Sequence, residues 1–237
     1  MGARTKIRRL PERQRRDRAE LYRILDAALV AHVSVVRDDG HPVVIPFACA
    51  RDGDTLLLHG STGSGVLSAA ASAAPIAVGV TLLDGLVVAR SVFDSSMNYR
   101  SVVAFGVPAV LEGTEKIEAL QVLVDRLLPG RWEEVRASTR KELTATLVLR
   151  LPLDEVSVKV RAEPVTSDPE DGEDRAVWTG VLPLVTWAGD PVTHGDVPPG
   201  VPVPSSVLAA MGRTRDQASE VQDAATRAAR LDPPQSP

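Results

Sequence analysis

The chain has 237 residues, of which 44% are hydrophobic, 24% are charged and 3% are aromatic, and its formal net charge is -4. This length and composition allow one sizeable core filled mainly by Ala, Val and Leu, so we do not expect a disordered chain. The net negative charge gives no reason to expect that the chain binds nucleic acid or an anionic membrane.

The charge is unevenly distributed along the chain. Residues 1–23 carry nine Lys or Arg against three acids, whereas residues 162–237 carry twelve acids against five bases. We interpret residues 1–20 as a basic N-terminal arm that is solvated or lies between subunits, rather than as a nucleic-acid contact. Residues 21–185 are expected to form the main domain, and residues 186–237 a Pro/Gly-rich and polar C-terminal extension.

The cell compartment is predicted from what the sequence lacks. The single cysteine, Cys49, rules out an internal disulfide and a thiolate metal cluster. No apolar run is long enough to span a membrane, and charged residues follow the basic N-terminus where a signal peptide would be apolar. No two histidines have the spacing of metal ligands, so we expect no metal site. We predict a cytoplasmic protein with no membrane partner.

In chain order, the first predicted element is a helix that opens at Pro11 and carries an apolar stripe at positions 21, 24, 25, 28 and 29. Short strands and tight turns follow. The predicted strands cover residues 33–36, 42–50, 55–59, 76–82, 86–93, 101–111, 147–151 and 156–161, with a hairpin turn at Asp84-Gly85. Helices are predicted at 66–74 and 114–128. Residues 177–185 are a further apolar stretch, and the last thirty residues are a polar tail. Closely spaced strands with few helices predict a mainly β fold, a closed or partly closed barrel with flanking helices.

Residues 94–101, with the sequence DSSMNYRS, separate two apolar strands in this prediction. Asn98, Tyr99, Arg100 and Ser101 bring polar edges, an aromatic face and a fixed positive charge together. This set suits a planar anionic ligand, although an ordinary loop with a solvated Arg also fits these residues alone.

Residues 60–65, with the sequence GSTGSG, form a second loop that leads into a helix. Backbone N–H groups and the hydroxyls of Ser61, Thr62 and Ser64 favour an anion there. Val66-Leu67 stands where a P-loop requires Lys-Ser/Thr, so nucleotide hydrolysis is rejected. A flexible Gly/Ser turn is the simpler alternative. Taken together, however, a phosphate held by this loop and Arg100, with a flat ring near Tyr99, describes a site for flavin mononucleotide (FMN).

At this point the sequence resembles a known family. The motifs are HGS at 59–61, LLDGL at 82–86, ARS at 89–91 and SMNYRS at 96–101, with ILDAA at 24–28, PGRW at 129–132, SVKVR at 157–161 and VWTGVLP at 177–183. They are similar to the flavin-nucleotide-binding branch of the pyridoxamine 5'-phosphate oxidase-like proteins, which includes the nitroimidazole-resistance proteins. The resemblance covers roughly residues 8–185. It implies an FMN-binding split β-barrel, a homodimer, and flavin in clefts at the subunit interface.

Carried over to this chain, the resemblance implies twelve cofactor-binding residues. On the phosphate side they are His59, Gly60, Ser61, Ser64, Arg100 and Ser101; along the ring Val44, Ile45 and Pro46; and beside them Asn98, Tyr99 and Trp178, the last capping the site from the second subunit. No catalytic side chain is assigned, because the cofactor itself carries the electrons. The implied function is a flavin-dependent oxidoreductase that acts on a small molecule.

Two departures from the family pattern leave alternatives open. Gly65 stands where the family usually has Arg, and Asp94-Ser95 stands where it tends to carry a His pair. One lost charge-assisted contact is worth about 1.5–3 kcal/mol, roughly ten- to a hundredfold in affinity. One alternative is therefore a haem-binding enzyme on the same fold, with His59 as the candidate ligand. Another is a non-enzymatic flavin store or a member that has lost its cofactor.

Overall fold

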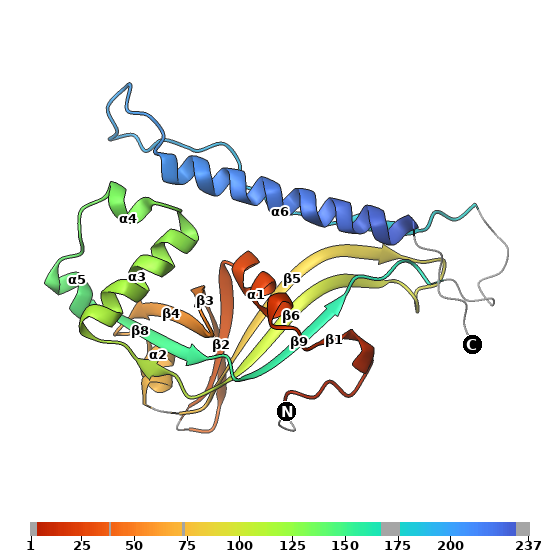
Figure 1. Cartoon of the computed structure of the whole chain (residues 1–237), viewed down its shortest axis with the longest axis horizontal. Helices are drawn as coiled ribbons and strands as arrows, with labels where there is room; N and C mark the ends of the chain where they lie inside the picture. The colour runs from red at the N-terminus through yellow and green to blue at the C-terminus, as the bar shows by residue number, and fades with distance from the viewer. Residues whose placement is uncertain (1–3, 38, 73, 167–175, 231–237) are drawn as a thin grey trace. The chain divides into compact units, whose positions relative to one another are not determined.

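The computed structural model describes residues 4–37, 39–72, 74–166 and 176–230 (Figure 1). Its helical elements are η1 (Pro11–Arg13), α1 (Arg18–Ala27), α2 (Gly65–Ala71), α3 (Gly113–Leu127), α4 (Arg131–Glu134), α5 (Arg140–Ala145) and α6 (Ser205–Arg230). Its strands are β1 (Gln14–Arg15), β2 (Val30–Val36), β3 (Pro42–Asp52), β4 (Thr55–Ser61), β5 (Ile76–Val88), β6 (Ser96–Gly106), β7 (Ala109–Val110), β8 (Thr146–Pro152), β9 (Glu155–Arg161) and β10 (Gly180–Pro183).

Within the described residues the strands form a sheet in the order β1-β9-β6-β5-β2-β3-β4-β8-β7, and β10 pairs with β5. The pairings of β2 with β3, β3 with β4 and β4 with β8 are all antiparallel. A mainly antiparallel sheet with flanking helices is the fold class predicted from the sequence, and that prediction is confirmed.

The chain divides into two compact units. Unit 1 comprises residues 1–81, 101–159 and 190–210, and unit 2 comprises residues 82–100, 160–189 and 211–237. Strands β5, β6 and β9 and helix α6 each contribute residues to both units.

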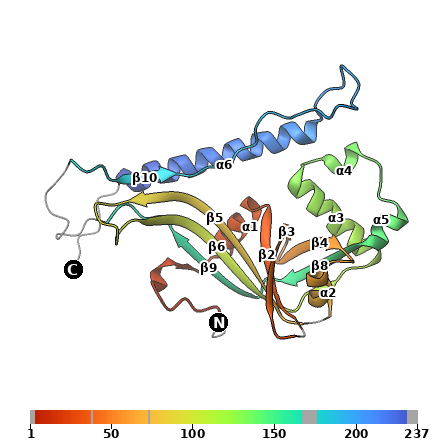
Figure 2. The same cartoon turned by 180° about the vertical axis from the view of Figure 1, so that it is seen from behind.

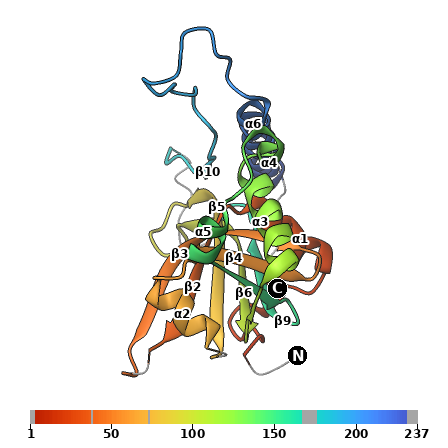
Figure 3. The ribbon, with the colours of Figure 1, turned by 90° about the vertical axis from the view of Figure 1, so that its left-hand side faces the viewer.

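The core of unit 1 forms where α3 packs on β3, β4 and β8 (Figure 3). The helix contributes Ala119, Leu120 and Leu123 from one face, as its 3.6-residue period requires. Ala50, Leu57 and Val148 meet them from the three strands, and all six side chains are buried.

The basic arm differs from the sequence prediction, because the chain does not form one helix from Pro11 onward. Leu10 adopts a left-handed conformation with φ 54°, and only a single 3-10 turn follows it. Gln14 then pairs with Lys159, so β1 docks on β9. Helix α1 begins afresh at Arg18, where the side chain of Asp17 caps it by accepting from the N–H of Ala19.

The predicted hairpin turn at Asp84-Gly85 is wrong, because β5 runs straight through these residues to Val88. Two contacts hold the strand extended there. Asp84 accepts two hydrogen bonds from Arg100, at 2.7 and 2.9 Å. Gly85 pairs with Pro183 of β10, and an added Cβ would lie 2.9 Å from the carbonyl oxygen of Leu182, so the missing side chain allows β10 to approach (Figure 2).

The second correction concerns residues 94–101. Only Asp94 and Ser95 lie in the loop, since β6 begins at Ser96 and extends to Gly106. Residues 86–93 are likewise not all strand, because β5 ends at Val88. The side chains of residues 96–101 therefore alternate across a strand instead of projecting together from a rim.

The polar C-terminal tail contains a helix that the sequence prediction did not identify. Helix α6 is 26 residues long, and its first turn is held in unit 1 by Glu134 of α4. The carboxylate accepts hydrogen bonds from both hydroxyls and one N–H of Ser205 and Ser206, which hold its pKa at about 2. None of the described helices combines the length and the apolar character needed to cross a membrane.

Candidate functional site

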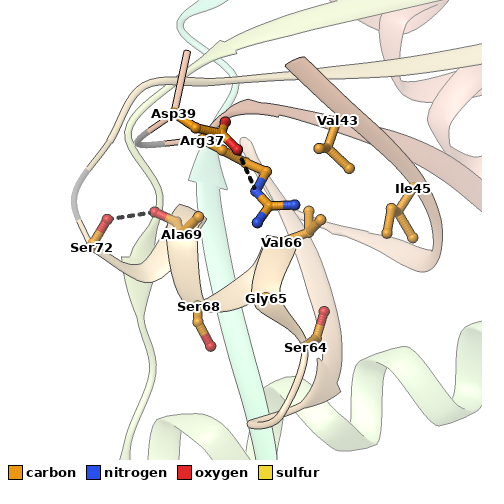
Figure 4. A pocket seen from close by; sticks show the side chains of 10 residues that line it. All are labelled: Arg37, Asp39, Val43, Ile45, Ser64, Gly65, Val66, Ser68, Ala69 and Ser72. Carbon is orange, nitrogen blue, oxygen red and sulfur yellow. Dashed lines mark hydrogen bonds and ion pairs between the residues drawn. The ribbon is translucent and has the colours of Figure 1, made fainter. Parts of the chain in front are cut away.

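The candidate site is a half-open pocket of about 710 Å³ in unit 1, within the size range of small-molecule sites (Figure 4). The tip of the β2–β3 hairpin and the start of β3 form one wall, and α2 forms the other. Its lining residues are Arg37, Asp39, Val43, Ile45, Ser64, Gly65, Val66, Ser68, Ala69 and Ser72.

Arg37 supplies the positive charge of this pocket. It directly follows β2, and its N–H donates to the carbonyl of His41 at 3.0 Å, which fixes the backbone near the hairpin tip. Its guanidinium extends toward α2, near Val66 (Figure 4). The ion pair with Asp39 is long, at 3.9 Å, and both side chains are more than half exposed, so it holds the guanidinium weakly.

The hydroxyl of Ser64 contributes to the polar side of the site. Ser64 lines the pocket and caps α2, accepting from the N–H of Leu67 at 3.5 Å. A hydroxyl that accepts one hydrogen bond can donate its proton at the same time, and an anion in the pocket is a suitable acceptor for it. Ser61, the last residue of β4, accepts from the N–H of Gly63 at 3.1 Å and is not among the residues that line the pocket.

The apolar wall comes from an open edge of β3. On one side Val44, Ile45 and Pro46 pair with Ser34, Val33 and His32 of β2. On the other side, within the residues that the structure describes, β3 pairs with β4 only from Cys49 to Asp52. Val44 is 59% exposed and Ile45 36%. This arrangement offers backbone N–H and C=O groups beside apolar side chains. The sequence analysis placed residues 44–46 along the flavin ring, where such backbone groups can bind its polar edge.

His59 lies in β4, opposite Val148 of β8. Burial lowers the pKa of its imidazole, so the ring is neutral at pH 7. Its Nδ1 is buried without a hydrogen-bond partner in the described part of the chain. A neutral imidazole with a buried, unpaired nitrogen has the chemistry of a metal ligand.

The glycine at position 60 is explained by packing alone, with no need for a bound ligand. A Cβ at this position would lie 2.5 Å from Cδ1 of Leu67 and 3.3 Å from the ring of Phe47. Leu67 is fully buried and anchors α2 against the sheet. Glycine is therefore required for α2, and hence Ser64, to approach β4.

The other predicted residues lie on β6, except Trp178, which precedes β10 by two residues. Asn98, in unit 2, is 5% exposed, and its amide is fully engaged by Arg161 Nη1 at 2.8 Å and by the N–H and C=O of Glu163 at 3.2 and 3.0 Å. This network gives Asn98 a structural role. Arg100 forms a two-pronged ion pair with Asp84 within the same unit, and Tyr99 is half-buried. The assignment of these residues to a cofactor stays a prediction.

Ser101 and Trp178 complete the predicted set. Ser101, in unit 1, donates to the carbonyl of Lys159 at 3.4 Å, a bond across β6 and β9. Trp178, in unit 2, is 65% exposed, and its ring lies over Gly180, where an added Cβ would meet it at 2.7 Å. An exposed indole is able to cover a ligand, and the role of Trp178 as a cap from the second subunit stays a prediction.

Sequence reasoning missed Arg37, Asp39, Ser68 and Ser72 as pocket residues. Between the strands predicted at 33–36 and 42–50 the sequence, DDG at 38–40, indicates only a hairpin turn, and turn chemistry does not show that the residues beside it line a pocket with α2, some thirty residues later. One signal for the open edge was present, however. Pro46 within a strand indicates an edge or an unpaired segment.

Comparison with known proteins identifies what the chain is similar to. The family profile described as Pyridoxamine 5'-phosphate oxidase matches residues 17–160. No match was found among curated proteins.

Three solved structures place this match in context. An FAD and haem binding protein from Mycobacterium smegmatis shares 47% identity, with 84% of this chain and 97% of that chain covered and a TM-score of 0.80. The flavocytochrome Anf3 from Azotobacter vinelandii shares 36% identity, with 88% and 96% covered and a TM-score of 0.81. A Bacteroides thetaiotaomicron protein assigned to 5-nitroimidazole antibiotic resistance shares 21%, with 62% and 86% covered and a TM-score of 0.53, and supports the fold alone.

Proposed function

Because the chain belongs to the pyridoxamine 5'-phosphate oxidase family and has its split-barrel fold, we propose that it is a flavin-binding oxidoreductase acting on a small molecule. The observation that carries this proposal is the pocket in which Arg37 and Ser64 stand beside the open edge of β3. A flavin nucleotide needs the same combination: a cation and hydroxyls for phosphate, and backbone groups with apolar side chains for the ring.

The residues present fit that cofactor. Arg37 and the hydroxyl of Ser64 would hold the phosphate, while Val43 and Ile45 would orient the ring and exclude water from one face. When bound, the flavin supplies the electron-transfer chemistry. The protein's own part is to bind, to orient and to set the local electrostatics. The family pattern usually has an arginine at position 65, where this chain has glycine. Arg37 would supply the missing positive charge.

A second candidate function is haem binding by His59, either alone or together with flavin. The buried, unpaired Nδ1 and the neutral ring favour it, and two similar structures are those of an FAD and haem binding protein and of a flavocytochrome. In this proposal the imidazole of His59 would hold the haem through its iron, and the haem would supply the redox chemistry.

We also propose that the protein is a cytoplasmic homodimer with its flavin clefts at the subunit interface. Membership of the family supports the dimer. The single buried Cys49, which leaves the described chain without a disulfide, suits a reducing compartment.

Absorption spectroscopy and titration of the purified protein test the proposal. Apo-protein titrated with FMN and with FAD should bind at least one of them, and Arg37→Gln should weaken that binding roughly ten- to a hundredfold. Arg8→Gln is the matched control, because Arg8 is an exposed arginine outside the pocket. Failure to bind either flavin would refute the flavin function.

The haem alternative has its own readout. Haem gives a single intense band at roughly 400 nm, distinct from the two bands of a flavin. His59→Ala should abolish that band and leave flavin affinity unchanged. A haem band of undiminished intensity in His59→Ala would exclude this histidine as the ligand.

A further inference from the structure

A second pocket, of about 480 Å³, lies entirely within unit 2. One wall is the segment that follows β10, and the other is one face of α6. Its lining residues are Val185, Trp187, Arg215, Ala218, Ser219, Gln222 and Asp223. It shares no lining residue with the pocket that contains Arg37 and Ser64. It is therefore a separate site, which we call the α6 pocket.

The lining residues of α6 lie on one face of the helix. Positions 215, 218, 219, 222 and 223 have the spacing i, i+3, i+4, i+7 and i+8 of a single helical stripe. Ala218 and Ser219, in the middle of this stripe, are small and leave room for a ligand. Arg215 and Asp223 stand at its two ends, about 12 Å apart along the axis at 1.5 Å per residue. The face thus carries a cation at one end, and an amide and a carboxylate at the other.

The opposite wall is held in place on both sides of Trp187. The N–H of Leu184 donates to the carbonyl of Asp84 at 3.0 Å, which ties the chain to β5. The N–H of Ala188 donates to the hydroxyl of Thr214 at 3.0 Å, which ties it to α6. Because these two anchors are close together in the sequence, the backbone of Trp187 is fixed beside the helix. Its indole is nevertheless 69% exposed and offers a flat aromatic surface to a ligand.

The polar groups at the two ends of the pocket are available to a ligand. Within the part of the chain that the structure describes, the side chains of Arg215, Gln222 and Asp223 form no hydrogen bond or ion pair. Ser219 differs, because its hydroxyl donates to the carbonyl of Arg215 at 3.1 Å. A guanidinium donates in a planar fork, an amide both donates and accepts, and a carboxylate accepts. The pocket therefore combines three hydrogen-bonding characters with one aromatic face.

We propose that the α6 pocket binds an adenylate group, either as a free adenine nucleotide or as the adenylate half of a dinucleotide. The base would stack on Trp187, since every base has a π-face that an aromatic side chain can cover. The amide of Gln222 matches the amino group and N7 of adenine, one donor and one acceptor. The carboxylate of Asp223 would accept the second proton of that amino group. At the other end of the stripe, Arg215 would bind the phosphate.

Charge complementarity favours this ligand over other occupants of the pocket. An anionic membrane surface requires a cluster of basic residues, whereas this face carries one arginine against one aspartate. An apolar peptide would cover Arg215 and Asp223 without giving either a partner, which costs free energy. Uracil and thymine present a carbonyl oxygen where adenine presents its amino group, and the carboxylate of Asp223 would repel it.

Isothermal titration calorimetry of the purified full-length chain with adenosine monophosphate (AMP) tests the proposal. Two related compounds show which groups are recognised. Adenosine lacks the phosphate, and inosine monophosphate has a carbonyl in place of the amino group. Each should bind at least about tenfold more weakly than AMP, because each loses a hydrogen bond to a charged side chain.

Matched variants locate the binding in this pocket. Trp187→Ala should weaken AMP binding at least about fivefold, whereas Trp187→Phe keeps an aromatic face and should retain most of the affinity. Arg215→Gln should weaken it roughly ten- to a hundredfold. Arg227→Gln is its control, because Arg227 is an exposed arginine of the same helix that does not line the pocket. Circular dichroism checks that all four variants fold.

Each outcome decides one question. Absence of AMP binding at millimolar concentration overturns the proposal, and so does an affinity that Trp187→Ala and Arg215→Gln both leave unchanged. Equal affinities for AMP and inosine monophosphate overturn the assignment of adenine. If Trp187→Ala also weakens binding of FAD but not of FMN, the adenylate half of a dinucleotide is the occupant; if both flavins bind as before, it is the free nucleotide. AMP binding by a protein that takes up neither flavin nor haem would support this site and count against the function proposed above.

Discussion

Substituting Gly65 by arginine restores a charge at the start of α2, and its effect can be estimated from the structure. Gly65 lines the pocket, and an added Cβ meets no atom within 4 Å, so a side chain can leave the backbone there without a clash at its Cβ. A charge-assisted hydrogen bond to phosphate is worth about 1.5–3 kcal/mol, so we expect Gly65→Arg to tighten FMN binding roughly ten- to a hundredfold. The gain should shrink at high salt, because the site is half-open.

Gly65→Gln is the matched control for this prediction. Gln and Arg both improve on glycine in a helix, by up to about 1 kcal/mol, so both variants should unfold at a similar, slightly raised temperature. Only the charged side chain should increase affinity. Fluorescence titration with FMN at low and high NaCl gives the measurement, and Gly65→Arg should also rescue Arg37→Gln. Equal affinities in Gly65→Arg, Gly65→Gln and wild type would refute the placement of phosphate in this pocket.

Three further predictions concern other parts of the chain. Burial raises the pKa of the Cys49 thiol from its ordinary 9.0 to about 11, so the unfolded chain releases this proton first as pH rises. Relative to Cys49→Ala, the free energy of unfolding should fall by about 2.7 kcal/mol in total as the pH rises from well below 9 to well above 11, and identical pH profiles would contradict the shift. Gly85→Ala should detach β10, because the new Cβ lies 2.9 Å from a backbone oxygen of that strand. Gly79→Ala is the control, since its Cβ meets nothing within 4 Å. Amide hydrogen exchange at residues 180–183 should become faster in Gly85→Ala and stay unchanged in Gly79→Ala. Arg100→Ala should lower flavin affinity at least tenfold, whereas Asp84→Asn, which frees the guanidinium of Arg100, should not. If both variants lose the same thermal stability and keep their flavin affinity, the ion pair has only a structural role.

Much of the fold follows from local patterns that the sequence contains. Alternating Val33 and Val35 in β2, and the helical spacing of Leu21, Ile24 and Leu25 in α1, are buried as those periods predict. Such patterns work because each element hides one face against a single core. The Asp84-Gly85 prediction failed because turn propensity is a local preference, and the pairing of Asp84 with Arg100 and of Gly85 with β10 overrides it.

Site residues could be predicted only where residue types suited to a ligand stand close together in the sequence. Ser64 lies in a Gly/Ser-rich loop before a helix, and Ile45 belongs to a strand that contains Pro46, so these positions could be selected from the sequence. Arg37 could not, because its role depends on a hairpin tip meeting α2, a tertiary arrangement with no sequence signature. Asn98 shows the converse: a polar residue among ligand-like neighbours is buried and hydrogen-bonded to Glu163.

The open stretch of β3 has a consequence for handling the protein. Unpaired backbone groups along a strand invite pairing with another chain, and the apo-protein should therefore be the aggregation-prone form. Pro42 and Pro46 lack N–H donors and blunt this tendency. Expression with ample riboflavin should raise the soluble yield, and Pro46→Val should make that yield far more dependent on the vitamin.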